Sequence, residues 1–325
     1  MSKLGKTVGW FGNMAVAAQE EQLGADHPRI NVEHLFLALL RIGGPVTDAL
    51  AAEGVTLAVG RKAVDQTHAQ RLASLGISLP GGSDGPRERR QDYLAPLEFD
   101  QRAQRLLERA ANQAEQDVTL FHTLLDEPSG RVRAVLEVLG VEPANLELAA
   151  VAPPPLAEPP PAQADPTQRW YEYRRFVPER PAAVWALVSD PERWLEWNQW
   201  EHQKAESTEP GTIRAFTKAL GSNGKPVRLK PGLETAIYVV KANEPERLIE
   251  WERSWPELRS PVHTHFRIEL VPRGSGTEVI LKFRADKPKG HFKRLLRFIV
   301  RPLIRPSTGF YLRAKAQGIS LALSK

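Results

Sequence analysis

Two kinds of hydrophobic periodicity divide the chain. Up to about residue 150, apolar residues recur at the roughly 3.6-residue spacing of amphipathic helices. After a proline-rich stretch they alternate with polar residues at a period of about two, the spacing of half-buried strands. The pattern therefore predicts an all-helical domain followed by a domain rich in β-strands.

The helical region contains an internal repeat. The stretch Leu35–Val55 aligns with Leu120–Val141, since each has leucine pairs, a turn and a helix that ends in Gly-Val. Upstream, Ala17–Glu20 resembles Ala110–Gln113, so each half predicts an amphipathic helix, a connection and a helix-turn-helix closed by a glycine C-cap. The glycine-rich break Pro80–Arg90 is expected to be an internal loop.

A linker separates the two regions. Val151–Pro166 carries so many prolines that neither helix nor sheet can form, which favours an extended polyproline spacer. We therefore predict a helical domain over residues 1–150, a linker over residues 151–167 and a second domain over residues 168–325.

This division makes a prediction for proteolysis. A linker without regular hydrogen bonds is the most cleavable part of a chain, so limited proteolysis is expected to cut first within about Val151–Gln168 and to release two folded pieces. Mass spectrometry of the first fragments checks this. First cuts inside either domain, with the linker intact, would contradict the boundary.

The second domain is expected to have an α+β fold. Trp170–Val177 alternates as a strand, and prolines at the first helical position open short helices at Pro181 and Pro191. A hairpin turn is predicted at Arg273–Gly276, and a helical segment ends the chain. A curved antiparallel sheet should wrap this terminal helix. The remaining predicted strands are Thr212–Thr217, Glu234–Lys241, Arg247–Trp255, Val262–Val271 and Thr277–Arg284.

Composition excludes several functional classes. The 325 residues include 42% hydrophobic and 26% charged positions, which is ordinary for a globular protein of two domains. Cysteine is absent, so disulfides, thiolate nucleophiles and cysteine metal sites are excluded. A net charge of +5 is small for this length, and no nucleic-acid partner is expected. The N-terminus lacks the features of a signal peptide, and a cytoplasmic location is expected.

The first domain resembles the Clp ATPase N-terminal repeat domain. The resemblance covers roughly residues 8–145 and is most specific at Asn31–Leu40, which looks like the Glu-His-aliphatic helix of that family. In family members that bind phosphoarginine, this glutamate in each repeat helps to hold the guanidinium, so the resemblance implies a binding role for Glu33. The second repeat has Val118 and Thr119 at the corresponding pair. No ATPase motor is recognisable, because Gly5–Thr7 only mimics the end of a phosphate-binding loop.

The second domain resembles the START-like superfamily, also called SRPBCC or polyketide cyclase-like. The resemblance covers roughly residues 168–325 and rests on Val184–Asn198 and on the order of the strands. It implies a helix-grip fold in which an apolar cavity between the sheet and the C-terminal helix binds lipids, polyketides or other hydrophobic small molecules. The superfamily implies a fold but no particular reaction.

Aromatic residues and one arginine are the candidate ligand-binding residues of this domain. Trp251, Arg253 and Trp255 share one face of a predicted strand, and Phe266 lies on the apolar face of the next. Given the resemblance, these side chains could line the cavity with Arg253 as an anchor for an acidic or carbonyl group. The alternative, equally weighted, is that they fill the core. Trp197 and Trp200 end the second short helix, where such cavities often open, and could also be plain packing.

Metal binding and catalysis have weak support. His263 and His265 share a strand face, but that face also carries Arg267 and Glu269, so the histidines are expected to face water. No triad, paired-carboxylate pattern or cofactor loop is recognisable, and we predict no catalytic residue, metal or cofactor. The basic segment His291–Pro306 could lie on an anionic membrane, but it more often covers a core in such a fold, so membrane contact is not expected.

These features favour a non-enzymatic binding protein. The helical domain is expected to bind Clp-type clients, adaptors or peptide-like ligands, in one version as a decoy that sequesters ligands of a Clp ATPase. The START-like domain is expected to bind a hydrophobic small molecule. The competing hypothesis is a cyclase- or hydrolase-type enzyme, which would be favoured by polar groups that converge in the interior of the second domain.

Overall fold

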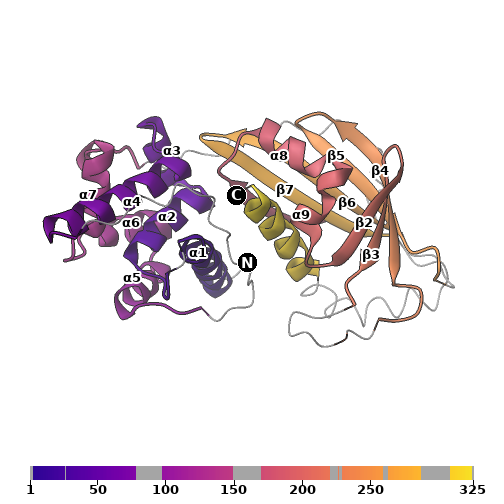
Figure 1. The fold of residues 1–325 in the computed structure, drawn as a ribbon, viewed down its shortest axis with the longest axis horizontal. Coiled ribbons are helices and arrows are strands. Elements are labelled where there is room, and N and C mark those ends of the chain that lie inside the picture. The colour runs from indigo at the N-terminus through magenta and orange to yellow at the C-terminus, as the bar shows by residue number, and fades with distance from the viewer. Residues whose placement is uncertain are drawn as a thin grey trace. The chain divides into compact units, whose positions relative to one another are not determined.

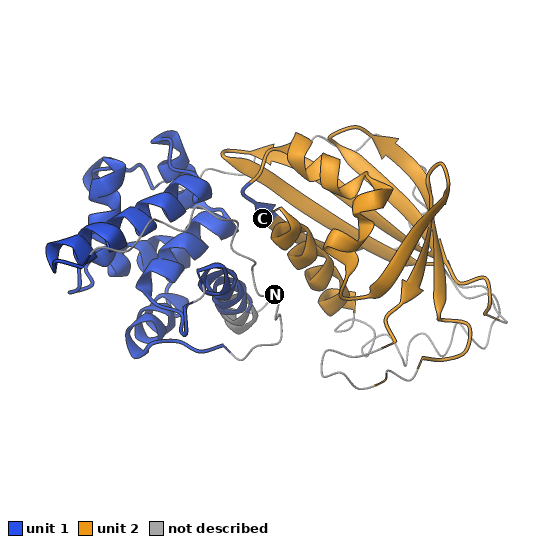
Figure 2. Ribbon diagram, viewed as in Figure 1, with its two compact units in different colours: residues 1–153, 176–178 blue, residues 154–175, 179–325 orange. Residues whose placement is uncertain are grey.

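The chain forms two compact units in a computed structural model (Figure 2). The first comprises residues 1–153 and 176–178, and the second comprises residues 154–175 and 179–325. The structure describes residues 3–25, 27–77, 97–148, 170–219, 226, 229–258, 263–286 and 308–323. The predicted loop Pro80–Arg90, the linker Val151–Pro166 and the basic segment His291–Pro306 lie outside the described residues.

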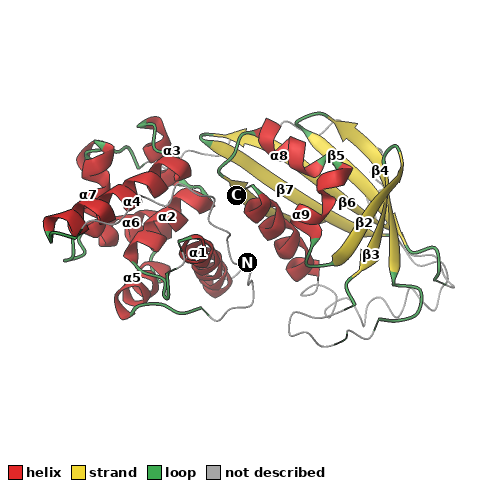
Figure 3. Cartoon of the chain, in the orientation of Figure 1, coloured by secondary structure: helices red, strands yellow, loops and turns green. Residues whose placement is uncertain are grey.

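The first unit is helical in all of its longer described elements, as the 3.6-residue periodicity predicted (Figures 1 and 3). Its elements are α1 (Lys3–Gly24), α2 (Val32–Ile42), α3 (Pro45–Ala52), α4 (Leu57–Ser74), α5 (Gln101–Ala111), α6 (Gln116–Leu125), α7 (Arg131–Leu139) and the 3-10 turn η1 (Pro143–Asn145).

Helix α2 is the centre of this unit. Ten of its eleven residues are buried, from Val32 to Arg41, so it is surrounded by the other helices. The Asn31 side chain caps the helix by accepting hydrogen bonds from the backbone N–H groups of Glu33 and His34, at 3.0 and 3.1 Å. The buried Arg41 is held by ion pairs with Glu20 and Glu21 of α1.

The two halves of the helical unit end their second helices in the same way. Gly54 follows α3 with φ of 79°, and Gly140 follows α7 with φ of 70°. The valine after each glycine donates its N–H to a carbonyl five residues earlier, from Val55 to Leu50 and from Val141 to Leu136. Only glycine adopts this left-handed conformation without strain, which explains the Gly-Val ending of both halves.

The second unit is built on a seven-stranded sheet in the order β1-β7-β6-β5-β4-β3-β2 (Figure 1). Pairing is antiparallel from β2 through β7, as predicted. The strands are β1 (Tyr171–Val177), β2 (His202–Glu209), β3 (Thr212–Thr217), β4 (Thr235–Glu244), β5 (Leu248–Ser254), β6 (His263–Arg273) and β7 (Gly276–Ala285).

Most of the predicted strands occur within a few residues of their expected positions. The hairpin predicted at Arg273–Gly276 joins β6 to β7, with Arg273 paired to Gly276. Strand β2 was not predicted. Its burial alternates poorly, with His202 as its only fully buried residue, because it lies at the edge of the sheet and most of its side chains face solvent.

Short helices follow β1, and the C-terminal helix packs on the same face of the sheet. The short helices are α8 (Pro181–Val188), the 3-10 turn η2 (Pro191–Arg193) and α9 (Trp194–Asn198), and residues 308–322 are helical at the C-terminal end. A Cβ atom at Gly318 would lie 2.2 Å from the carbonyl oxygen of Trp197. The C-terminal helix therefore approaches α9 at a distance that only glycine permits.

Among the described residues, no single helix is long and apolar enough to cross a membrane. Taken together, α2 and α3 are long and apolar enough by the same criterion, but the two helices are bent by 87° relative to each other.

Candidate functional site

An aromatic cluster fills the interior of the second unit. Trp251 of β5 and Phe266 of β6 are opposite each other in register and stack with ring centroids 6.0 Å apart. Trp194 and Trp197 of α9 pack on Trp251 at 5.6 and 6.1 Å. These four side chains are at most 2% exposed.

Arg253 lies beside this cluster, on the same face of β5 as Trp251. Its Nη1 donates to Glu201 Oε1 at 2.7 Å, and its Nε donates to Thr264 Oγ1 at 3.1 Å. The hydroxyls of Tyr238 and Tyr311 lie 3.4 Å from the same Nη1. Burial acts to lower the pKa of Arg253, but the tyrosine oxygens and Glu201 raise it well above its ordinary value. The guanidinium is therefore permanently charged.

Lys315 of the C-terminal helix is the most unusual residue of the site. Its side chain is completely buried, and its Nζ lies 5.3–5.7 Å from the centroids of five aromatic rings. The ammonium group donates to Asn198 Oδ1 and lies 3.0 Å from Glu201 Oε2. Burial lowers the pKa of Lys315, Glu201 opposes this shift and Arg253 adds to it, and together they bring the pKa to about 8.

Glu201 joins the two buried cations. Burial alone would raise the pKa of its carboxyl, but Lys315 and Arg253 lower it to about 2. The neighbouring His202 donates or accepts a hydrogen bond with the Tyr238 hydroxyl at 3.0 Å. Burial and the same two cations lower the pKa of His202 to about 3, so its imidazole is neutral near pH 7.

The structure brings the six candidate residues of this domain together. Trp197, Trp251 and Phe266 belong to the aromatic cluster, and Arg253 lies at its border. Trp200 is partly buried beside Tyr311 at 5.6 Å, and the ring of Trp255 lies 4.4 Å from the Arg253 guanidinium. Their contacts are those of a packed interior with a polar border.

The sequence analysis did not identify most of the residues that form the polar border of the aromatic cluster. The missed residues are Trp194, Asn198, Glu201, His202, Tyr238, Tyr311 and Lys315. Lys315 had a usable signal, because it lies between Leu312, Ala316 and Ile319 on the apolar face of its helix. A lysine on a buried face is rare unless it is paired.

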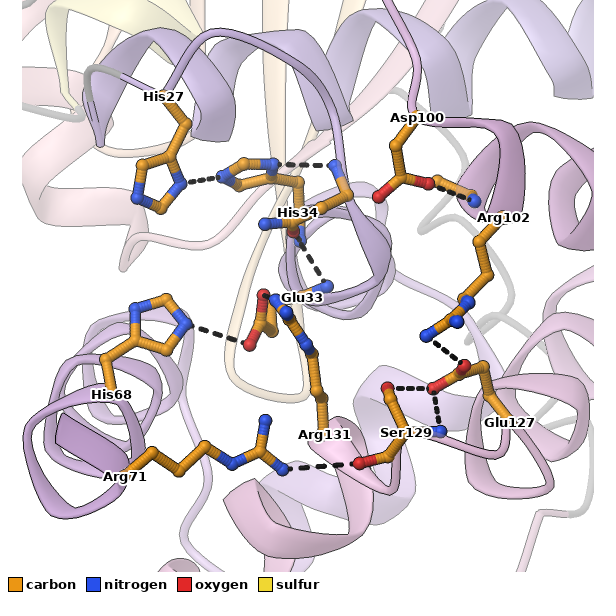
Figure 4. A network of polar contacts seen from close by, with 12 residues as sticks. His27, Glu33, His34, His68, Arg71, Asp100, Arg102, Glu127, Ser129 and Arg131 are labelled. Atoms are coloured by element: carbon orange, nitrogen blue, oxygen red, sulfur yellow. Dashed lines mark hydrogen bonds and ion pairs between the residues drawn. The ribbon is translucent and has the colours of Figure 1, made fainter. Parts of the chain in front are cut away.

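The helical unit places Glu33 in a polar network (Figure 4). The carboxylate is 1% exposed and accepts from Arg131 Nη1 at 3.1 Å, and His68 Nε2 lies 2.8 Å from its other oxygen. Burial acts to raise the pKa of Glu33, but His68 and then Arg131 lower it below its ordinary value. Glu33 thus already holds a guanidinium, that of Arg131 on α7.

The second half of the helical unit has its carboxylate at another position. Val118 is partly buried against the hydrophobic core. Glu127 instead forms an ion pair with Arg102 at 2.8 Å and accepts hydrogen bonds from Ser129 (Figure 4). Glu33 and Glu127 are thus both buried and bound to an arginine, but they are not at matching positions of the two halves.

Two histidines lie beside Glu33. The Asn31 backbone N–H donates to His34 Nδ1 at 3.0 Å, so the neutral ring of His34 carries its proton on Nε2 and donates it to His27 Nδ1 at 2.9 Å. Burial and the neighbouring His27 lower the pKa of His34 to about 4. Nevertheless, among the described residues no group of three or more His, Asp or Glu side chains is arranged to hold a metal ion.

The expectation that both β6 histidines face water was wrong for His265. This residue is only 9% exposed and lies 3.3 Å from Glu250 and 3.4 Å from Asp286. His263, near the start of the strand, has 40% of its side chain exposed and pairs with Glu252 at 3.0 Å. Neighbouring strands and their carboxylates cover the middle of this face, which a single strand pattern does not reveal.

Residues 171–309 match the family model described as polyketide cyclase / dehydrase and lipid transport. This match supports a polyketide cyclase-like domain at these residues. The family model does not extend into the helical unit. No curated protein matches the chain.

Solved structures of low sequence identity align with about half of the chain. A protein of unknown function from Staphylococcus aureus is 11% identical, with a TM-score of 0.37, and covers 48% of this chain and 94% of its own. A START superfamily protein from Mycobacterium smegmatis is 13% identical, with a TM-score of 0.34, covering 48% and 97%. A conserved protein from Geobacillus kaustophilus is 14% identical, with a TM-score of 0.33, covering 48% and 95%.

Proposed function

We propose that the START-like domain binds a hydrophobic small molecule without transforming it. The observation that carries the proposal is the aromatic interior of Trp194, Trp197, Trp251 and Phe266, which borders the buried polar residue Arg253. The family description, which includes lipid transport, supports the same ligand class. Arg253, Trp197, Trp200, Trp251, Trp255 and Phe266 are the proposed ligand contacts.

A neutral apolar dye tests this proposal. N-phenyl-1-naphthylamine added to the full chain is expected to gain fluorescence, to quench tryptophan emission and to raise the melting temperature by mass action. Trp200→Ala is expected to weaken binding, because Trp200 is partly buried at the border of the cluster. Trp185→Ala on α8 is the matched control and should bind normally. Absence of dye binding to the parent protein would refute the proposal.

A second candidate is a cyclase- or hydrolase-type enzyme acting on the same ligand. Buried polar groups do converge in the domain, with Lys315, Glu201 and His202 within reach of one another. A lysine whose pKa is lowered to about 8 could exchange a proton near neutral pH. Turnover of apolar esters or polyketide-like substrates that is lost in Lys315→Met would favour the enzyme over the carrier.

For the helical unit we propose binding of Clp-type clients, adaptors or peptide-like ligands, with guanidinium recognition at Glu33. The buried carboxylate already binds one guanidinium from within the chain, which supports the chemistry of the site. In one version of this proposal the unit sequesters ligands that a Clp ATPase would otherwise receive.

Substitutions at this site have opposite expected effects. Because the Glu33 carboxylate is already paired with Arg131, the parent protein should bind a phosphoarginine peptide weakly. Arg131→Ala should raise the affinity about tenfold, which corresponds roughly to the free energy of one charge-assisted hydrogen bond. Glu33→Ala should remove binding. Arg133→Ala, on the same helix and paired with Asp126, is the control. Calorimetric titration that finds equal affinity in all four proteins would exclude this role for Glu33.

A further inference from the structure

The buried polar groups of the START-like domain carry an excess positive charge. Lys315 and Arg253 are cationic, and Glu201 is anionic. Among the described residues, Glu201 is the only carboxylate in an ion pair with either cation. The other neighbours, Asn198 and His202, are neutral near pH 7. One positive charge therefore remains uncompensated in a largely dry interior, which is costly unless an anion balances it.

The tryptophan rings around Lys315 carry unused hydrogen-bond donors. No described residue accepts a hydrogen bond from the buried indole Nε1 of Trp194, Trp197 or Trp200. The rings of these three tryptophans lie 5.4–5.7 Å from Lys315 Nζ. Trp194 and Trp197 are at most 1% exposed, so their N–H groups have no access to bulk water. Orphaned buried donors are uncommon in native proteins and indicate a missing acceptor.

A continuous series of aromatic contacts connects the cluster to the surface. Trp200 is partly buried and packs edge-on against Phe310, with ring centroids 6.4 Å apart. Phe310 is 68% exposed, which is high for a phenylalanine. From Trp200 the aromatic surface continues to Tyr311 and then to Lys315. An apolar chain could lie along these rings while its end group meets the ammonium.

We propose that the cluster around Lys315 binds the carboxylate of a hydrophobic organic acid. The carboxylate balances the positive charge of the Lys315 ammonium, the indole N–H groups of the three tryptophans supply donors, and the aromatic rings contact the apolar body. Arg253 already has hydrogen-bond partners in Glu201, Thr264 and two tyrosines. Arg253 therefore adds positive charge to the site, whereas Lys315 contacts the ligand's carboxylate. This proposal rests on the proposed binding of a hydrophobic ligand and names its chemical class.

Matched ligands test the proposal on the full chain. Decanoate and 1-decanol have the same number of carbon atoms, and calorimetric titration at pH 7 is expected to find decanoate bound at least about tenfold more tightly, because only the acid forms an ion pair with the ammonium. Lys315→Met, which removes the charge at similar volume, is expected to abolish this preference. Lys282→Met is the matched control, since Lys282 of β7 pairs with Glu269 outside the cluster.

Indole resonances provide a readout that does not depend on a variant's folding. In ¹⁵N-resolved spectra of the parent protein, decanoate should shift the N–H signals of Trp194, Trp197 and Trp200 more than decanol does, with Trp200→Phe assigning one of them. Equal affinity for acid and alcohol would overturn the inference and leave the proposed function standing. A preference for the acid that survives in Lys315→Met would overturn it as well. Binding of neither ligand would refute both.

Discussion

Replacing Glu201 with glutamine is expected to lower the free energy of unfolding of the C-terminal unit by about 3–5 kcal/mol, the usual cost of removing one partner of a buried ion pair. The carboxylate oxygens of Glu201 lie 2.7 Å from Arg253 Nη1 and 3.0 Å from Lys315 Nζ, and only 18% of the Glu201 side chain is exposed. Without its charge, two buried cations would face each other unbalanced. Urea denaturation followed by tryptophan fluorescence measures the effect.

Glu206→Gln is the control for this substitution. Glu206 lies on β2, the strand that directly follows Glu201, but its pair with Lys204 is exposed to water, so stability should hardly change. An unchanged urea midpoint in Glu201→Gln would show that the buried cluster does not depend on this carboxylate.

The same residue makes the stability of the unit depend on pH. The pKa of Glu201 is lowered to about 2 in the folded state, so between its unfolded value near 4.5 and 2 the unfolded chain binds more protons. The stabilisation is therefore fully present above about pH 4.5 and is lost as the pH falls towards 2. The stability difference between the parent and Glu201→Gln should shrink over this window, and a constant difference would contradict the assignment.

Replacing Trp251 with alanine is expected to destabilise the C-terminal unit by about 3–5 kcal/mol, because it removes a large side chain from a packed interior. Trp251 is 1% exposed and contacts Trp194, Trp197 and Phe266. The surrounding rings belong to both the sheet and α9, which limits how far they can close the space left behind.

The measurement is urea denaturation compared with Trp185→Ala, whose residue lies on α8 and is only partly buried. The loss at position 185 should be clearly smaller. A stable Trp251→Ala variant that no longer binds the neutral dye would instead identify Trp251 as a ligand contact whose removal the fold tolerates.

Much of the fold could be predicted from the sequence because local patterns report on local structure. Periodicity distinguished the helical unit from the sheet unit, proline positions placed the starts of α8 and η2, and the Gly-containing turn placed the β6–β7 hairpin. Strand β2 was not predicted, because an edge strand with mostly exposed side chains shows little alternation of apolar and polar residues.

The candidate site could be predicted in its apolar part and at Arg253. Trp251 and Arg253 stood out because two positions on one strand share a face, and the same rule placed Phe266 on the neighbouring strand. The charged partners did not stand out. Lys315 lies on the apolar face of its helix, but its partner Asn198 is 117 positions away, and no sequence pattern connects the two residues.

The sequence by itself determined most of the helices and strands, the two classes of domain and the aromatic content of the second core. Only the tertiary structure decided which charged side chains form ion pairs. It paired Arg131 with Glu33 across 98 positions, and it brought Glu201, Arg253 and Lys315 together from the turn before the edge strand β2, from the central strand β5 and from the terminal helix. The reason is physical: periodicity reports which face of an element is buried, whereas the partner of a buried charge depends on how separate elements pack.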